Sequence, residues 1–262
     1  MRTTIVLIIL VMLAGAAPAQ TYVSGNIQTD TTWYATNSPY VIQDQVTVLN
    51  DVTLTIQAGV TVAFEADSNL SSAWGGHIVA DGAPGNRILF TSDAATPAPS
   101  DWHFVQPFGS DASSFTYCTF EYAADGLRAN GSSPTVDHCT FRHCAYGVHC
   151  YNGSPVVTHS EITDCNIGIR IYGSSSIPSF NHCNIHGHAM GNLVVTYFPA
   201  PAATIDAENN WWGATGETAI AATISDAQDS GFVHATVDFD PWRGAMPVEE
   251  MSWGGVKAVY GR

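Results

Sequence analysis

The sequence predicts an all-β protein built as a parallel solenoid, in which each coil of short strands stacks on the coil before it. Three observations predict this fold: a repeat of nearly fixed length, short strands with alternating apolar positions, and no helical pattern inside the repeat. The repeat reads Phe115-x-x-Cys118-x-Phe120, Val136-x-x-Cys139-x-Phe141, Val157-x-x-Ser160-x-Ile162 and Phe180-x-x-Cys183-x-Ile185. Its cysteine or serine anchors lie 21, 21 and 23 residues apart.

A glycine opens the next strand of each repeat, and the aligned glycines are Gly126, Gly147, Gly168 and Gly191. The residues that follow, Leu127, Val148 and Ile169, are predicted to form one inward column. One coil cannot bury its apolar face alone, whereas coils stacked about 4.8 Å apart can. A β-sandwich would need hairpin turns and would not keep a fixed register over four repeats. The pattern of a leucine-rich repeat is absent.

The composition excludes several classes of protein. The 262 residues include 8 Lys+Arg against 23 Asp+Glu, which gives a formal net charge of −15. Binding to nucleic acid or to an anionic membrane requires a basic surface that this chain lacks. Because 45% of the residues are hydrophobic and only 12% are charged, neither a disordered chain nor a charged helical bundle is expected.

The N-terminus has the pattern of a secretory signal peptide. Arg2 precedes a short apolar run over residues 5–13, and Ala17-Pro18-Ala19 offers a cleavage site of small residues. The run is too short to span a bilayer, and no other stretch is long and apolar enough to do so. We therefore expect cleavage after Ala19 and a secreted protein, either extracellular or on the cell surface.

Several segments inside and outside the repeats carry a resemblance to a known family. They are Ser133-Pro134-Thr135-Val136-x-x-Cys139-Thr140-Phe141 and Asn184-Ile185 in the repeats, Val23 to Phe64, His77 to Asp93 with Asp101-Trp102, Ala207 to Gly213, and Val237 to Trp242. These segments resemble right-handed parallel β-helix proteins of the pectin-lyase-like superfamily, of the secreted bacterial type. The resemblance covers roughly residues 22–244, and it implies a right-handed single-stranded parallel β-helix. It implies little about function, because this scaffold carries lyases, hydrolases, adhesins and proteins without known activity.

A short amphipathic helix is predicted between Gly216 and Asp229, because Ala219, Ile220, Thr223 and Ile224 fall on one helical face. This helix would cap the C-terminal end of the solenoid, and the segment from Tyr22 to Tyr40 would cap the other end. The predicted organisation is a signal peptide (1–19), an N-terminal cap with the first coils (20–113), regular repeats (114–213), a C-terminal cap (214–244) and a tail (245–262).

The six cysteines fall into columns of the repeat, which favours small buried core residues over disulfides. One column holds Cys118, Cys139 and Cys183, a second holds Cys144 and Cys165, and Cys150 occupies a core position of its own. Neighbouring coils lie within disulfide reach, so Cys118–Cys139 and Cys144–Cys165 bridges remain the alternative. The cysteine spacing does not match a zinc site.

Three histidines, His138, His159 and His182, share one column with Tyr117 above them. We interpret this column as a sharp corner of the coil, because histidine tolerates a left-handed backbone conformation better than most residues. The alternative is a transition-metal site built from stacked imidazoles. We predict neither a metal site nor a cofactor.

No catalytic residues are predicted. The patterns N-T-D, G-D-D, G-H-G and R-x-K of polygalacturonase-like relatives are absent, and so is the Asp-Pro-His motif of uronan epimerases. Two cross-coil charge pairs are expected, Glu121 with Arg142 and His143 with Asp164. The acids predicted to point outward are Glu121, Asp125, Asp137, Glu161 and Asp164.

One outward strip is the candidate binding site. Alternation places Arg128, His149 and Arg170 outside, with Asn130, Tyr151 and Tyr172 two residues further on. We predict that Arg128, His149, Arg170, Tyr151 and Tyr172 bind a polysaccharide or cell-surface glycan, since arginine grips carboxylates and tyrosine offers ring faces. The alternative is a ladder that only covers the sheet. The sequence thus favours a non-catalytic structural, adhesin-like or glycan-contacting protein; the alternative is a polysaccharide lyase or glycoside hydrolase acting on acidic glycans.

Overall fold

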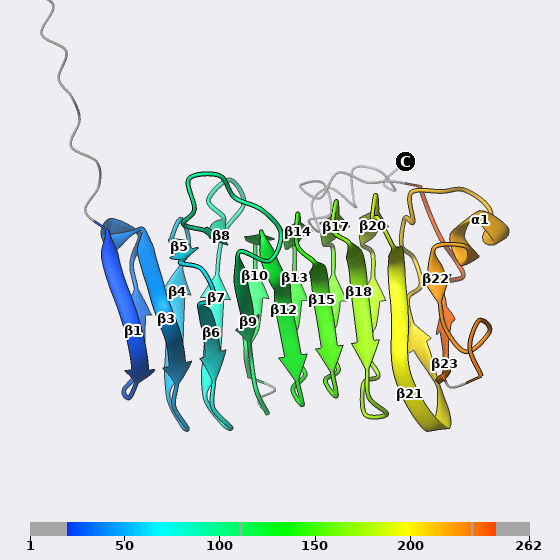
Figure 1. Ribbon diagram of the computed structural model, residues 1–262, viewed down its shortest axis with the longest axis horizontal. Coiled ribbons are helices and arrows are strands. Elements are labelled where there is room, and N and C mark those ends of the chain that lie inside the picture. Colours follow the sequence, from blue (N-terminus) through cyan, green and yellow to red (C-terminus); the bar gives the residue numbers. More distant parts are fainter. Residues whose placement is uncertain (1–19, 110–111, 232, 245–262) are drawn as a thin grey trace, which may run out of the picture.

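The computed structural model describes residues 20–109, 112–231 and 233–244, which form one elongated solenoid (Figure 1). Every pairing between its named strands is parallel. Each strand pairs with the equivalent strands of the neighbouring coils, which is the arrangement that the repeat predicts. Figure 1 shows the strands succeeding one another along the long axis.

The strands of the described residues form three ladders that wrap one core. The first ladder contains β1 (Thr21–Ile27), β3 (Tyr40–Val48), β5 (Thr61–Phe64), β8 (Ile88–Ser92), β11 (Cys118–Glu121), β14 (Thr140–Arg142), β17 (Glu161–Thr163) and β20 (Asn184–His186). The second contains the later parts of β1 and β3, then β6 (Asn69–Ser72), β9 (Trp102–Gln106), β12 (Ala123–Asn130), β15 (Tyr146–Tyr151), β18 (Ile167–Tyr172), β21 (Gly191–Asp206) and β22 (Ile224–Ser225). The third contains β2 (Thr31–Trp33), β4 (Thr53–Gln57), β7 (His77–Asp81), β10 (Ser114–Thr116), β13 (Thr135–Asp137), β16 (Val156–Thr158), β19 (Ser179–Asn181), the end of β21 and β23 (Val233–Asp238).

The inward column predicted from the repeat is confirmed. Leu127 lies in register with Val148, which lies in register with Ile169, and all three side chains are fully buried. A second inward column stacks aromatic rings, with ring centroids 4.7 Å apart between Phe90 and Phe120 and 4.8 Å apart between Phe120 and Phe141. The core is therefore a set of side-chain stacks that run along the solenoid axis.

The repeat glycines are required by the close approach of neighbouring coils. A Cβ atom on Gly147 would lie 2.7 Å from the carbonyl oxygen of Gly168 and 2.9 Å from the Ile162 side chain. The predicted alignment fails at the fourth glycine, because Gly191 pairs with Ile167 and not with Gly168. This unit is two residues longer than those before it, and the extra length shifts the register of β21.

The histidine column forms the predicted corner. His138, His159 and His182 have φ angles of 53°, 47° and 60°, and Tyr117 above them has 46°. Their rings stack with centroid distances of 4.6, 5.1 and 5.5 Å down the column. A left-handed residue at this point turns the chain from the third ladder into the first.

His143 and Asp164 lie in a second corner column, where their left-handed φ angles of 54° and 51° turn the chain. The described contact between them is a backbone hydrogen bond of 3.1 Å from the His143 N–H to the Asp164 carbonyl, where a side-chain pair was expected. The other expected pair is confirmed, because the Arg142 Nε and Nη2 atoms lie 2.9 and 2.7 Å from Glu121 Oε2. Glu121, which was predicted to be an outward acid, is buried by its neighbours, since it accepts hydrogen bonds from Arg142 and from Thr91.

All six cysteines are free and buried, as the column pattern predicts. In the column of Cys118, Cys139 and Cys183, each backbone N–H after the corner donates a hydrogen bond to a side chain on the next coil. The N–H of Cys118 donates to the Cys139 sulfur at 3.4 Å, and the N–H of Cys139 donates to the Ser160 hydroxyl at 3.0 Å. The N–H of Cys183 donates to Asn210 Oδ1 at 2.7 Å. Thiol, hydroxyl and amide therefore play the same structural part.

We expect the thiols to be unreactive in the folded protein and countable after unfolding. Burial raises the pKa of Cys183 to about 12 and raises the pKa values of Cys118, Cys144 and Cys150 as well, so these thiols form little thiolate at neutral pH. Hydrogen bonds from Cys144 and His188 lower the pKa of Cys165 to about 6, so for this thiol it is burial that limits access of the reagent. Alkylation without reductant should add few mass tags to the native protein and six to the denatured protein. Four or two tags on the denatured chain would instead show one or two of the alternative bridges.

The ends of the solenoid differ from the predicted caps. The C-terminal helix α1 is shorter than expected (Glu217–Ala221), and only Ile220 of its residues is buried. Ala219 is exposed, and Ile224 lies in β22, where its pairing with Leu193 replaces the predicted last helical turn. Residues from Thr21 onward form the first coil through β1, β2 and the 3-10 helix η1 (Ala35–Asn37). The predicted signal peptide and tail lie outside the described residues, and no described helix is long and apolar enough to cross a membrane.

Candidate functional site

The predicted strip is assembled on the outer face of the second ladder. His149 lies in register with Arg128 on one side and Arg170 on the other, across β12, β15 and β18. Tyr151 lies in register with Asn130 and Tyr172 in the same strands. The structure thus brings together all five residues that the sequence singles out, and it divides them into two parts of different character.

The first part is an exposed row of tyrosines that extends one coil further than predicted. The rings of Tyr151 and Tyr172 are parallel with centroids 5.0 Å apart, and Tyr197 follows at a further 5.0 Å. Tyr151 is 38% exposed and Tyr197 is 45% exposed. Because the ring faces stack on each other, the row offers its edges and hydroxyl groups to solvent, where ring faces were expected. Tyr197 was missed because the ladder register shifts between Ile171 and Tyr172.

The second part of the strip is buried and internally neutralised. Asp125 is only 1% exposed, and its carboxylate pairs with the Arg128 guanidinium and lies 3.1 Å from His149 Nδ1. The Arg128 guanidinium carbon also lies 4.0 Å from the centroid of the Phe104 ring. Asp125, which was predicted to be an outward acid, contacts the outward side chains of Arg128 and His149, and these cover its carboxylate.

His149 lies on the outer face as predicted, but its side chain is only 7% exposed. The ring of Tyr146 lies 5.7 Å away and that of Tyr151 lies 5.9 Å away, edge-on. Nδ1 contacts Asp125, while Nε2 is buried and has no hydrogen-bond partner in the part of the chain that the structure describes. A histidine oriented by a carboxylate is the pairing that general bases use, although its second nitrogen is closed to solvent in this conformation.

Arg170 remains available at the surface. It is half-buried, its guanidinium carbon lies 4.8 Å from the centroid of the Tyr146 ring, and its Nε donates to the Thr196 hydroxyl at 3.3 Å. No carboxylate partner of Arg170 occurs among the described residues. The sequence analysis named Asp125 as an outward acid but did not connect it with the strip; its position three residues before Arg128 in the same strand was the available signal.

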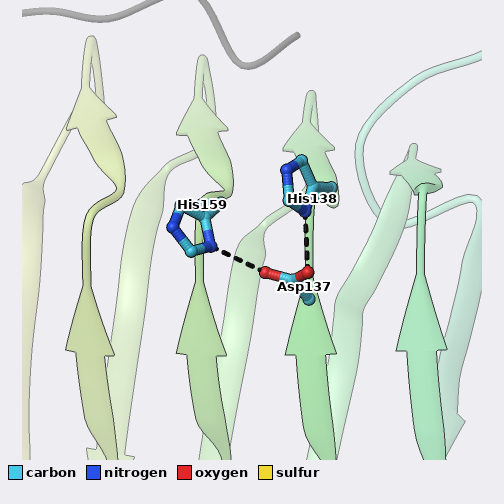
Figure 2. Close-up of side chains that lie close together, drawn as sticks. All are labelled: Asp137, His138 and His159. Carbon is cyan, nitrogen blue, oxygen red and sulfur yellow. Dashed lines mark hydrogen bonds and ion pairs between the residues drawn. The ribbon is translucent and has the colours of Figure 1, made fainter. Parts of the chain in front are cut away.

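A second polar cluster lies at the histidine corner, where Asp137 stands between two imidazoles (Figure 2). Asp137 Oδ2 lies 2.7 Å from His138 Nδ1, and its Oδ1 lies 2.9 Å from His159 Nδ1. The Thr158 hydroxyl donates to Oδ1 at 2.7 Å. Burial tends to raise the pKa of Asp137, but hydrogen bonds from His159, Thr158 and His138 outweigh it and lower this pKa to about 2.

A hollow of about 270 Å³ lies away from both clusters, at the C-terminal end of the solenoid. Its lining residues are Glu217, Val237, Asp238, Phe239, Asp240 and Trp242. The tyrosine row lies instead along a ladder of successive coils, a geometry that suits an extended ligand better than a small molecule.

Comparison with known families identifies the class of protein. Residues 102–232 match the family described as the right handed beta helix region, and residues 25–111 match the pectate-lyase like beta helix domain. The first match spans 131 of the 262 residues, which is half of the chain. The chain therefore belongs to the right-handed β-helix family, as a repeat protein of the pectin-lyase-like superfamily, and the predicted resemblance is confirmed. No curated protein and no solved structure matches it.

Proposed function

We propose that the protein is exported and binds an extended polysaccharide, without cleaving it, along the row formed by Tyr151, Tyr172 and Tyr197. The observation that carries this proposal is the row itself, in which three phenol groups on successive coils keep a spacing of 5.0 Å. In the described part of the chain, none of the three hydroxyl groups hydrogen-bonds to the protein. They are free to serve as donors and acceptors for a ligand.

The row suits a carbohydrate for a physical reason. Tyrosine has few rotatable bonds, and contact of each ring with its neighbour restricts it further, so that little conformational entropy remains to be lost on binding. Sugars present hydroxyl groups at regular intervals along an extended chain, and a ladder with one phenol per coil meets successive units. Each contact is weak, and several coils acting together supply the affinity.

The proposed ligand is rich in hydroxyl groups and poor in charge. Arg128 is already neutralised by Asp125, so Arg170 is the strip residue left to grip a uronate carboxylate. The chain carries a net charge of −15, which repels a polyanion at long range. We therefore expect neutral or sparsely charged glycans to bind better than polyuronates.

The test is a glycan-array screen followed by titration of the best ligand. The double variant Tyr151→Ala, Tyr172→Ala should weaken binding by about tenfold or more, since each lost contact is worth roughly 1 kcal/mol. Tyr22→Ala and Tyr34→Ala are matched controls, because these tyrosines are 57% and 48% exposed and lie near the N-terminal end. Equal losses in the row and in the controls, or no binding to any glycan, would contradict the proposal.

A second candidate function is polysaccharide cleavage, favoured by the pairing of Asp125 with His149. A base oriented in this way would act if the neighbouring tyrosines moved aside when a substrate binds. The same glycans are therefore incubated with the protein, and the release of reducing ends is measured. Release that disappears in His149→Gln while binding persists would favour the enzyme over the binding protein.

A further inference from the structure

We propose that Asp137, His138 and His159 form a binding site for one divalent first-row transition metal ion, of which Zn²⁺ is the representative. Two imidazole nitrogens from neighbouring coils approach the Asp137 carboxylate at this point, each at a different oxygen atom (Figure 2). The site is independent of the tyrosine row, because it lies at the corner between the third and first ladders, whereas the row lies on the second ladder.

The spacing of the ligand atoms can fit an ion after the side chains rotate. Asp137 contacts His138 through Oδ2 at 2.7 Å and His159 through Oδ1 at 2.9 Å, and the three ligand atoms lie within 4.8 Å of one another. Ligands that surround a tetrahedral Zn²⁺ at about 2.0–2.1 Å are about 3.3 Å apart. The two carboxylate contacts therefore have to open by about half an ångström, and the widest separation has to close by up to about 1.5 Å.

The fold holds the two histidines in place before any ion binds. Both have left-handed φ angles, 53° at His138 and 47° at His159, so their Cα–Cβ directions are fixed by the corner. Their rings stack with centroids 5.1 Å apart, which keeps both Nδ1 atoms on the side of Asp137. Such preorganisation lowers the entropy lost when an ion is bound.

The corner itself does not require an acid at the position of Asp137. The residues in register before the corner are Asp81, Thr116, Asp137, Thr158 and Asn181. The corner forms after Thr116, Thr158 and Asn181 just as it does after Asp137, so turning the chain needs no carboxylate. Of the two acids in this column, Asp81 and Asp137, Asp137 is the one that has a histidine beside it on its own coil and another on the next coil within the described residues.

Binding an ion requires a change of tautomer at both rings. An ionised carboxylate only accepts hydrogen bonds, so the Nδ1 atoms of His138 and His159 that contact Asp137 carry protons. An ion that takes the place of these contacts displaces both protons, either to the Nε2 atoms or to solvent.

The ligand set determines the kind of ion. Imidazole nitrogen suits Zn²⁺, Cu²⁺, Ni²⁺ and Co²⁺, whereas Ca²⁺ and Mg²⁺ prefer sites made of oxygen atoms alone. The side chains of Asp137 and His159 are 37% and 29% exposed, which leaves a path for the ion and room for water as a fourth ligand. Three protein ligands with one open position give weaker binding than a closed structural site.

The experiment is isothermal titration calorimetry of the tag-free protein with ZnCl₂ near neutral pH, and CaCl₂ is titrated for comparison. We expect one Zn²⁺ per chain at this site and no comparable Ca²⁺ binding. Asp137→Asn, His138→Asn and His159→Asn should each weaken Zn²⁺ binding by about tenfold or more. Asparagine is chosen for the histidines because it tolerates a left-handed backbone and preserves the corner.

Two control variants separate this site from its surroundings. Asp81→Asn removes an acid from the same ladder column, where Thr116 donates to it at 3.0 Å but no histidine follows. His182→Asn removes the next ring of the stack. Both should bind Zn²⁺ within about twofold of the original protein.

A measurement on the unaltered protein keeps the test decisive if a variant fails to fold. Zn²⁺ should protect His159, which is partly exposed, from carbethoxylation by diethyl pyrocarbonate, as mapped by peptide mass spectrometry. Absence of Zn²⁺ binding, binding that survives all three site variants, unprotected His159, or an equal loss in His182→Asn would each overturn the proposal.

Discussion

Replacing Val148 by Asp should prevent stable folding. Val148 lies between Leu127 and Ile169 in an inward column whose side chains are fully buried. A carboxylate there would lose its hydration without gaining a partner, at a cost of several kcal/mol. Total stabilities are typically only about 5–15 kcal/mol, so this loss is a large fraction of what holds a domain together. Soluble yield and thermal melting followed by circular dichroism measure the effect.

The matched control is Val156→Asp, which places the same change on a 45% exposed valine in a neighbouring strand of the repeat. Surface substitutions of this kind usually change the free energy of unfolding by no more than about 0.5 kcal/mol. A Val148→Asp protein that is soluble and melts at the original temperature would show that the assigned column is not the core. A control that fails equally would indicate that any added charge disrupts the strands.

Most of the fold could be predicted because, in a solenoid, the length of the sequence repeat determines which residues pair between neighbouring coils. Residues 21 apart, such as Leu127 and Val148, become neighbours in space, so alignment of repeats is equivalent to alignment of strands. The prediction failed where the repeat length changes and where the repeats stop. The longer fourth unit moved Gly191 by one position, and Ile224 joined a strand because pairing with Leu193 prevailed over the local helical pattern.

The candidate site was predicted only in part, because alternation along a strand gives the direction of a side chain and not what covers it. His149 points away from the core and is nevertheless buried beneath its neighbours, and Asp125 is enclosed by Arg128. The approach of Asp137 to two histidines was not visible either. It depends on the turn of the corner, which aims His138 and His159 back toward the carboxylate.

The buried acid Asp125 gives the second large effect that we expect. Asp125→Ala would remove the carboxylate that accepts from Arg128 and contacts His149, and would leave both polar side chains without it. Removing one partner of a buried pair typically costs about 3–5 kcal/mol. The Arg128 side chain is 28% exposed and regains some hydration, so the lower end of that range is expected. Asp44→Ala, at an exposed position in β3, is the matched control and should have little effect on the free energy of unfolding.

The double variant Asp125→Ala, Arg128→Met decides whether the loss comes from an orphaned charge. Arg128 lies against the Phe104 ring, a surface on which a methionine side chain also packs well. When both charged groups are removed, the cost of burying them disappears together with the attraction between them. The double variant should therefore recover a substantial share of the stability that Asp125→Ala loses. Urea denaturation gives the free energies, and hydrogen exchange in β12 and β15 locates the effect. If the double variant is as unstable as the sum of the single variants, the carboxylate stabilises this face through His149 or through packing, and the pairing with Arg128 contributes little.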